Sequence, residues 1–85
     1  MVLISHINIK LTIMSNLQEE TYKIIGKNVR KYRLANNISQ EKLSEILNVN
    51  CKFIGHVERF ERFISLKKII ELAEYFNVPV KTFFE

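Results

Sequence analysis

The chain has few of the residues that bend or end regular structure. It contains 2 Gly and 1 Pro in 85 residues, where average usage predicts about ten of the two together. Folds built from many short strands need turn residues between them, so this composition favours helices joined by short connections. Barrels, doubly wound sheets and two-domain architectures are excluded, because each needs a longer chain.

Cysteine, histidine and long apolar runs are also scarce. The single cysteine, Cys51, excludes an internal disulfide framework, and two distant histidines do not supply a zinc site. We therefore expect no metal and no cofactor. No apolar run approaches the length that spans a bilayer, so no membrane partner is expected. The serines lack a neighbouring His–Asp pair and there is no glycine-rich phosphate loop, which argues against an enzyme.

The charge is basic and unevenly distributed. The formal net charge is +4, and four basic residues lie in the seven-residue stretch Lys27–Arg33. A basic excess of this size suits a nucleic-acid partner. A solvated helix face would produce the same pattern, so the charge alone does not decide between the two.

The first 14 residues differ from the rest and are treated as an N-terminal arm, followed by one domain over residues 15–85. Residues 7–13 alternate strictly between apolar and polar side chains, which is the period of a half-buried strand. Such a strand has no partner in this chain, so it would pair with the same strand of a second copy. The alternative is a flexible or irregular leader.

The remaining pattern predicts an all-α fold of five helices. Ser15 and Gln18 fit a capping box, and apolar residues at helical spacing follow to about residue 36, with Tyr22, Ile25 and Val29 on the inner side. Ser39, Asn50 and Ser65 are N-cap candidates for three further helices, and Pro79 suits the start of a last short one. The expected ranges are 15–36, 40–47, 51–59, 66–76 and 80–84.

The second and third of these helices are short and separated by about three residues, which is helix-turn-helix geometry. The residues that fill it are more specific. They are Ser39-Gln40-Glu41-Lys42-Leu43-Ser44-Glu45-Ile46-Leu47-Asn48-Val49-Asn50, then Ile54 and Val57-Glu58-Arg59. They resemble the Cro/CI-type helix-turn-helix family of bacterial and phage regulators, and the resemblance covers everything except the N-terminal arm. It implies a compact lambda-repressor-like domain that binds double-stranded DNA as a homodimer at a palindromic operator and regulates transcription in the cytoplasm, as a bacterial or phage-encoded protein.

Within this family, the segment after the turn is similar to the controller proteins of restriction–modification systems. The similarity lies in Ile54-Gly55-x-Val57-Glu58-Arg59-x-Glu61-Arg62-x-Ile64-Ser65-Leu66. Phe60 and Phe63 stand where those proteins often have Gly and Asn, and Ser44 and Asn48 stand where the family usually has Ala and Gly. A bulky residue held at positive φ costs roughly 1 kcal/mol or more. We therefore expect the turn at Phe60 to be built differently here.

The first turns of a recognition helix face the floor of the major groove. The residues expected there are Cys51, Lys52, Phe53 and His56. Lys52 is suited to donate to guanine O6 or N7, and Phe53 to contact thymine methyl groups. His56 lies one turn beyond Lys52 on the same face and is suited to donate to a base or a phosphate. The alternative for each is a solvated side chain without a role in readout.

A second set is expected at the phosphates. It comprises Ser39, Gln40, Asn50, Lys27, Arg59 and Arg62. The resemblance also implies an ion pair between Arg33 and Glu58 that holds the recognition helix rather than reading DNA. The apolar C-terminus suggests a homodimer interface, formed by Val78, Val80, Phe83 and Phe84. The alternative function keeps the scaffold for protein–protein interaction, either as an adaptor with Phe60 and Phe63 on the binding surface or as an antitoxin that captures its partner with the N-terminal strand.

Overall fold

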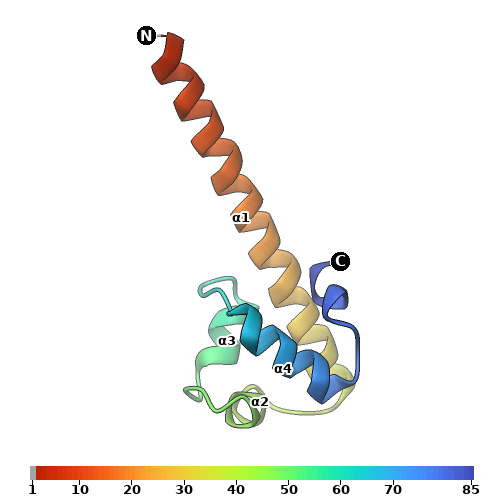
Figure 1. The fold of residues 1–85 in the computed structure, drawn as a ribbon. Coiled ribbons are helices and arrows are strands. Elements are labelled where there is room, and N and C mark those ends of the chain that lie inside the picture. Colours follow the sequence, from red (N-terminus) through yellow and green to blue (C-terminus); the bar gives the residue numbers. More distant parts are fainter. Residues whose placement is uncertain (1) are drawn as a thin grey trace.

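The computed structural model describes the backbone of residues 2–85 and the side chains of residues 16–85. The elements are α1 (Val2–Ala35), α2 (Gln40–Ile46), α3 (Phe53–Glu58), α4 (Leu66–Phe76) and the short 3-10 helix η1 (Val80–Phe84) (Figure 1). The prediction of an all-helical fold is confirmed, with no strand in the described backbone. The range predicted for α4 matches, and the ranges predicted for α2 and η1 agree to within a residue.

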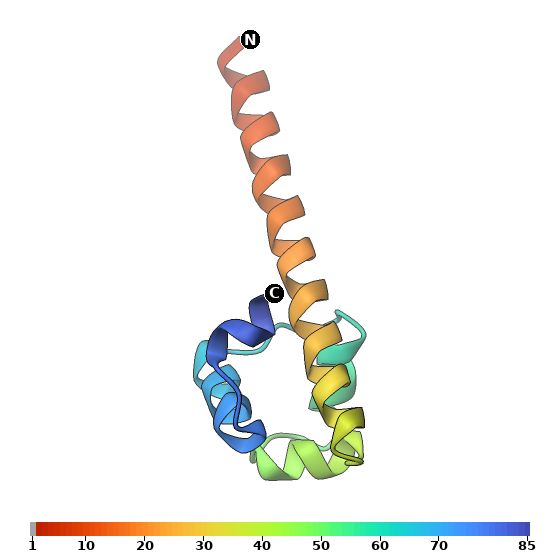
Figure 2. The ribbon, with the colours of Figure 1, turned by 90° about the vertical axis from the view of Figure 1, so that its right-hand side faces the viewer.

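Helix α1 is much longer than the sequence pattern predicted. Its N-terminal half projects away from the body of the molecule (Figures 1 and 2), whereas other parts of α1 contact α3 and η1. The strand expected at residues 7–13 is wrong, because this segment continues α1, and Ser15 lies inside the helix rather than at its N-cap. A strand would leave its backbone N–H and C=O groups unpaired in this chain, whereas a helix pairs them within itself.

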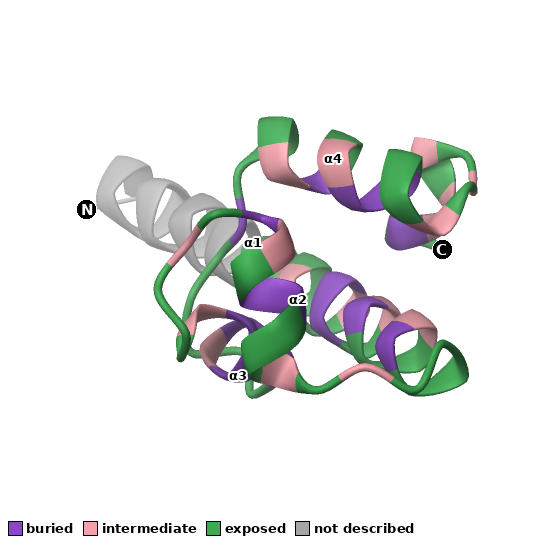
Figure 3. Ribbon diagram, turned by 90° about the horizontal axis from the view of Figure 1, so that it is seen from below, coloured by how far each residue is buried: buried purple, intermediate pink, exposed green. Residues whose placement is uncertain are grey.

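The core lies between the C-terminal half of α1 with α3 on one side and α4 with η1 on the other, and α2 closes the end far from the N-terminus (Figure 2). Figure 3 shows the buried residues on the inward faces of these elements. Ile25 and Val29 of the predicted inner stripe are buried, and the ring of Tyr32 packs against those of Phe76 and Phe83. The buried apolar cluster is Ile25, Val29, Leu43, Leu47, Ile54, Val57, Ile64, Ile69, Leu72, Ala73 and Phe83.

Each α-helix ends in the same kind of turn, with one residue in the left-handed conformation. These residues are Asn37, Asn48, Phe60 and Asn77, with φ of 54°, 57°, 66° and 56°. After α2, for example, Asn48 N donates to Glu45 O and Val49 N donates to Ser44 O, which is a Schellman motif. Asparagine tolerates this conformation better than most residues. The chain thereby ends three helices without glycine.

Phe60 adopts this conformation too, so the expectation that its turn would be built differently is wrong. Its backbone N donates to Val57 O at 3.1 Å, and Glu61 N donates to His56 O at 2.9 Å. The ring lies over Gly26 of α1, where an added Cβ would meet ring carbons at 3.0 and 3.1 Å. Contact between this ring and α1 offsets the backbone strain.

The left-handed strain at Phe60 predicts an unusual order of stability between two substitutions. Phe60→Ala removes the ring but keeps the strain, whereas Phe60→Gly removes both. We therefore expect the glycine variant to be more stable than the alanine variant by about 1 kcal/mol, measured by urea unfolding followed by circular dichroism.

The matched control pair is at Lys31, an exposed position inside α1. There the order should reverse, with Lys31→Ala more stable than Lys31→Gly by up to about 1 kcal/mol. The same order at both positions would contradict the strained turn.

Candidate nucleic-acid interface

Helices α2 and α3 form the helix-turn-helix. Ser39 begins α2 as predicted, because its side chain accepts a hydrogen bond from Lys42 N at 3.0 Å. The second helix of the pair begins at Phe53, two residues later than predicted. Asn50 Oδ1 accepts from Lys52 N at 2.9 Å, so Asn50 stabilises the turn that precedes α3 rather than the helix itself.

A buried serine joins the two helices. Ser44 in α2 is fully buried, and its Oγ accepts from Ile54 N of α3 at 3.2 Å. The first N–H groups of a helix have no partner within it, and Lys52 at the N-cap makes no side-chain hydrogen bond to them. Ser44 thus supplies to α3 a cap that comes from a neighbouring helix. Sequence reasoning noted this serine only as a departure from the family's usual alanine and missed the role.

At its other end, α3 is tied to α1 through its own last residue, Glu58. Arg33 Nε donates to Glu58 Oε2 at 2.6 Å and Arg33 Nη2 donates to Glu58 Oε1 at 3.0 Å. Arg33 Nη1 donates to Ile38 O at 2.9 Å. The two charged side chains are only 9% and 1% exposed, and the hydrogen bond to Glu58 raises the pKa of Arg33 above its ordinary value. This bidentate pair joins α1, the loop after it and α3.

Two further side chains approach the same carboxylate. Gln40 Nε2 donates to Glu58 Oε1 at 3.1 Å, so the amide expected at a phosphate contacts a protein acceptor with one of its two hydrogens. Arg30 Nη1 lies 3.7 Å from the same oxygen and is largely exposed. Sequence reasoning missed Arg30. Its position one helical turn before Arg33 was the available signal.

Between α2 and α3 lies an open cleft of about 370 Å³. It is lined by Gln40, Glu41, Cys51, Lys52, Gly55, His56 and Arg59. The fold therefore brings three of the four predicted base readers together with two of the predicted phosphate contacts. Gly55 matters for the shape of this cleft, because an added Cβ would lie 3.0 Å from both Gln40 Oε1 and Arg59 Nη1.

The remaining predicted DNA contacts lie elsewhere. Phe53 is half-buried and packs against the core, which leaves less of its ring for a base. Ser39 and Asn50 use a side-chain oxygen within the turn structure. Lys27 and Arg62 are exposed, on α1 and in the loop after α3.

A cluster of three charged or titratable side chains lies at the end of α3. Arg59 Nε donates to Glu61 Oε1 at 2.5 Å, and His56 Nδ1 lies 3.6 Å from the same oxygen. The hydrogen bond from Arg59 holds the pKa of Glu61 below its ordinary value. Sequence reasoning assigned Arg59 and His56 to DNA but gave Glu61 no role, because the left-handed turn at Phe60 decides where its carboxylate lies.

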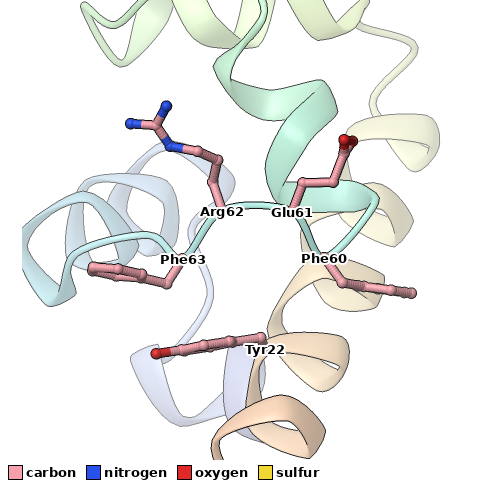
Figure 4. Close-up of a pocket in the computed structure, with 5 residues that line it drawn as sticks. All are labelled: Tyr22, Phe60, Glu61, Arg62 and Phe63. Carbon is pink, nitrogen blue, oxygen red and sulfur yellow. The ribbon is translucent and has the colours of Figure 1, made fainter.

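The loop after α3 also carries an aromatic pocket of about 220 Å³, lined by Tyr22, Phe60, Glu61, Arg62 and Phe63. The rings of Tyr22 and Phe63 stack with centroids 5.8 Å apart, and Phe63 is 66% exposed. Figure 4 shows Glu61 and Arg62 extending away from these rings.

The C-terminal residues do not all fit the expected dimer interface. Phe83 is fully buried in the core of a single chain, and Asn28 of α1 donates to its carbonyl at 3.1 Å. Its assignment to the dimer interface is therefore wrong, because this ring closes the monomer. Val78 and Val80 are half-buried against the same core, and Phe84 is exposed.

Comparison with known proteins agrees with this geometry. The helix-turn-helix family matches residues 29–83. The chain belongs to this family. Control protein C.SmaI of Serratia marcescens is 47% identical over 58 residues, which cover 68% of this chain and 69% of that protein. The predicted membership of the Cro/CI-type helix-turn-helix regulators, with a likeness to controller proteins, is confirmed.

Two solved structures are similar to this helix-turn-helix protein. The restriction-modification controller protein C.AhdI from Aeromonas hydrophila is 30% identical, with a TM-score of 0.67 over 74% of this chain and 96% of that one. The hypothetical transcription factor NHTF from Neisseria has a TM-score of 0.71 over 79% and 78% of the two chains, and its 24% identity supports the fold alone. In residues 2–85 no helix is long and apolar enough to cross a membrane.

The buried pair predicts that Arg33→Met destabilises the helix-turn-helix domain. Removal of Arg33 leaves Glu58 buried with only Gln40 and a distant Arg30, and we expect a loss of about 3 kcal/mol in the free energy of unfolding. Urea unfolding measures this loss. The matched control is Arg30→Met, which removes a largely exposed charge and should cost less than about 1 kcal/mol. Equal losses in the two variants would contradict the buried pair.

Proposed function

We propose that this protein is a sequence-specific DNA-binding regulator of transcription that acts as a homodimer on a palindromic operator, in the manner of a restriction–modification controller protein. One observation carries the proposal. The cleft between α2 and α3 gathers Lys52, His56, Arg59 and Gln40 on one surface, in a chain that is 47% identical to a control protein.

In this proposal α3 enters the major groove and Lys52 and His56 read bases. Lys52 is exposed at the start of α3 and is suited to donate to guanine O6 and N7. His56 lies one turn later along the same cleft. Cys51 lines the cleft beside Lys52, and Phe53 has only part of its ring available for a thymine methyl group.

Phosphate contacts would set the position of α3 without reading sequence. Gln40 keeps one amide hydrogen that Glu58 does not use, and Arg59 offers its outer guanidinium nitrogens. Lys27 and Arg62 are exposed cations outside the cleft, suited to the flanking backbone. The backbone around the caps Ser39 and Asn50 completes the proposed set.

A homodimer would place two copies of α3 about one DNA turn apart, roughly 34–36 Å, so that they read a two-fold site. The proposed interface uses Phe84, which is exposed, together with Val78 and Val80. An exposed aromatic next to half-buried valines is the composition of a surface that gains from being covered.

The experiment is selection of binding sites from random DNA duplexes at two salt concentrations, with the mass of the protein measured in the same samples. We expect enrichment of a palindrome with half-sites about ten base pairs apart and the mass of a dimer. The salt dependence of the affinity then counts the phosphates neutralised, because each steepens the slope by about 0.9. A folded dimer that enriches no sequence would contradict the proposal.

That contrary outcome would favour the second candidate function, a protein-interaction module. The aromatic pocket supports it, because Phe63 is 66% exposed beside Tyr22 and Phe60. Binding through such a surface should change little with salt, whereas binding to DNA weakens steeply.

The readout assignment predicts the effect of two alanine substitutions. We expect Lys52→Ala and His56→Ala each to relax base preference at one position of the half-site, at a cost of about 1–3 kcal/mol in discrimination. Binding-site selection measures the preference, and circular dichroism checks that the fold is retained. The control is Lys67→Ala on α4, which removes an exposed lysine of another helix and should leave preference unchanged. Unchanged base preference in both cleft variants would refute the assignment.

A further inference from the structure

The position of Glu61 follows from the backbone after α3. Phe60 turns the chain with a φ of 66°, and Glu61 N then donates to His56 O at 2.9 Å. This turn folds the chain back against the last turn of α3. The Glu61 carboxylate, although half-exposed, therefore lies beside the two basic groups of that turn.

The carboxylate contacts both of them. Glu61 Oε1 accepts from Arg59 Nε at 2.5 Å and lies 3.6 Å from His56 Nδ1. Arg59 Nη2 lies 3.5 Å from the same nitrogen of His56. One acidic side chain therefore links two of the basic residues that line the cleft.

This contact determines which part of Arg59 is available to a ligand. Nε is engaged by Glu61, and Nη1 lies 3.0 Å from the place of an added Cβ at Gly55, toward Gln40. Among residues 16–85, Nη1 donates to no protein acceptor. Because the guanidinium is planar, holding Nε directs Nη1 into the cleft. The fixed side chain has less conformational entropy to lose when it binds.

An acidic group at this place also has a cost. DNA presents a dense row of negative charges, so a carboxylate beside the cleft lowers affinity for any sequence. In return for this loss of general affinity, the salt bridge to Glu61 fixes the side chain of Arg59 in one geometry. The expected consequence is discrimination between sequences rather than tighter binding.

We propose that Glu61 is a positioning residue for specificity: it holds Arg59 in the geometry that fixes α3 on the phosphates, holds His56 in the geometry that reads a base, and weakens binding to other DNA. This inference rests on the proposed function. It adds a residue whose effect passes through Arg59 and His56 rather than through its own contact with a base.

The first test is Glu61→Gln, which keeps the size of the side chain and removes its charge. Affinities are measured at one salt concentration for the selected operator and for a duplex of random sequence. We expect affinity for the random duplex to rise about twofold to threefold, since one repelling charge is lost. We expect the ratio of operator to random affinity to fall about tenfold, the value of one well-placed base contact.

The matched control is Glu74→Gln, which makes the same charge change on an exposed residue of α4. Figure 2 shows α4 on the opposite side of the molecule from α3. The ratio should be unchanged in this control. An equal fall in both variants would mean that net charge, and not the position of Glu61, sets the ratio, and would overturn the proposal.

A double substitution separates positioning from direct readout. If Glu61 acts through Arg59, then adding Glu61→Gln to Arg59→Ala should change the ratio of operator to random affinity much less than Glu61→Gln changes it in the wild-type protein. The change that remains is the contribution through His56. Full additivity would mean that Glu61 contacts a base itself and would overturn the proposal. Without DNA, the Arg59 Nε–Hε NMR signal should exchange faster with water in Glu61→Gln than in the wild type.

The outcomes also distinguish this inference from the proposed function. A wild-type protein that prefers no sequence removes the proposed function and the inference with it. A wild-type protein with a clear operator preference, and an unchanged ratio in Glu61→Gln, overturns the inference alone.

Discussion

The orientation of the recognition helix depends on one buried ion pair. Arg33 and Glu58 are bonded at 2.6 and 3.0 Å, with almost no exposure of either side chain. A charge buried at this depth is stable only with its partner and further hydrogen bonds. Ile38 O and Gln40 supply these bonds, so the network joins α1, the loop after it, α2 and α3.

This dependence follows from the small size of α3. A helix of six residues is too short to be stable by itself, and its own N-cap residue offers no side-chain hydrogen bond. The rest of the domain holds it at both ends: Ser44 from α2 binds its first turn, Glu58 ties its last turn to α1, and Phe60 packs over Gly26. The outer face of α3 is thereby left for Lys52, His56 and Arg59. A rigid support of this kind suits a surface that must discriminate between similar ligands.

Sequence reasoning worked best where the signal is local. Ser39 and Ser65 accept the hydrogen bonds expected of N-caps. These features depend on a few neighbouring residues. The strand expected at residues 7–13 failed because alternation describes only side-chain polarity. It does not supply the second strand that a sheet needs.

The sequence by itself determined the all-helical class, the helix-turn-helix spacing and most of the residues that face its cleft, because caps, periodicity and motif spacing are local properties. The tertiary structure alone decided the rest. It placed Ser44 against the first turn of α3 and placed Gln40 and Arg30 beside Glu58. It also buried Phe83 in the core and brought the Glu61 carboxylate to Arg59 and His56. Except for Glu61, these contacts join residues ten or more positions apart. The contact of Glu61 depends on a strained turn at Phe60 that packing against Gly26 stabilises, and no local pattern predicts such a turn.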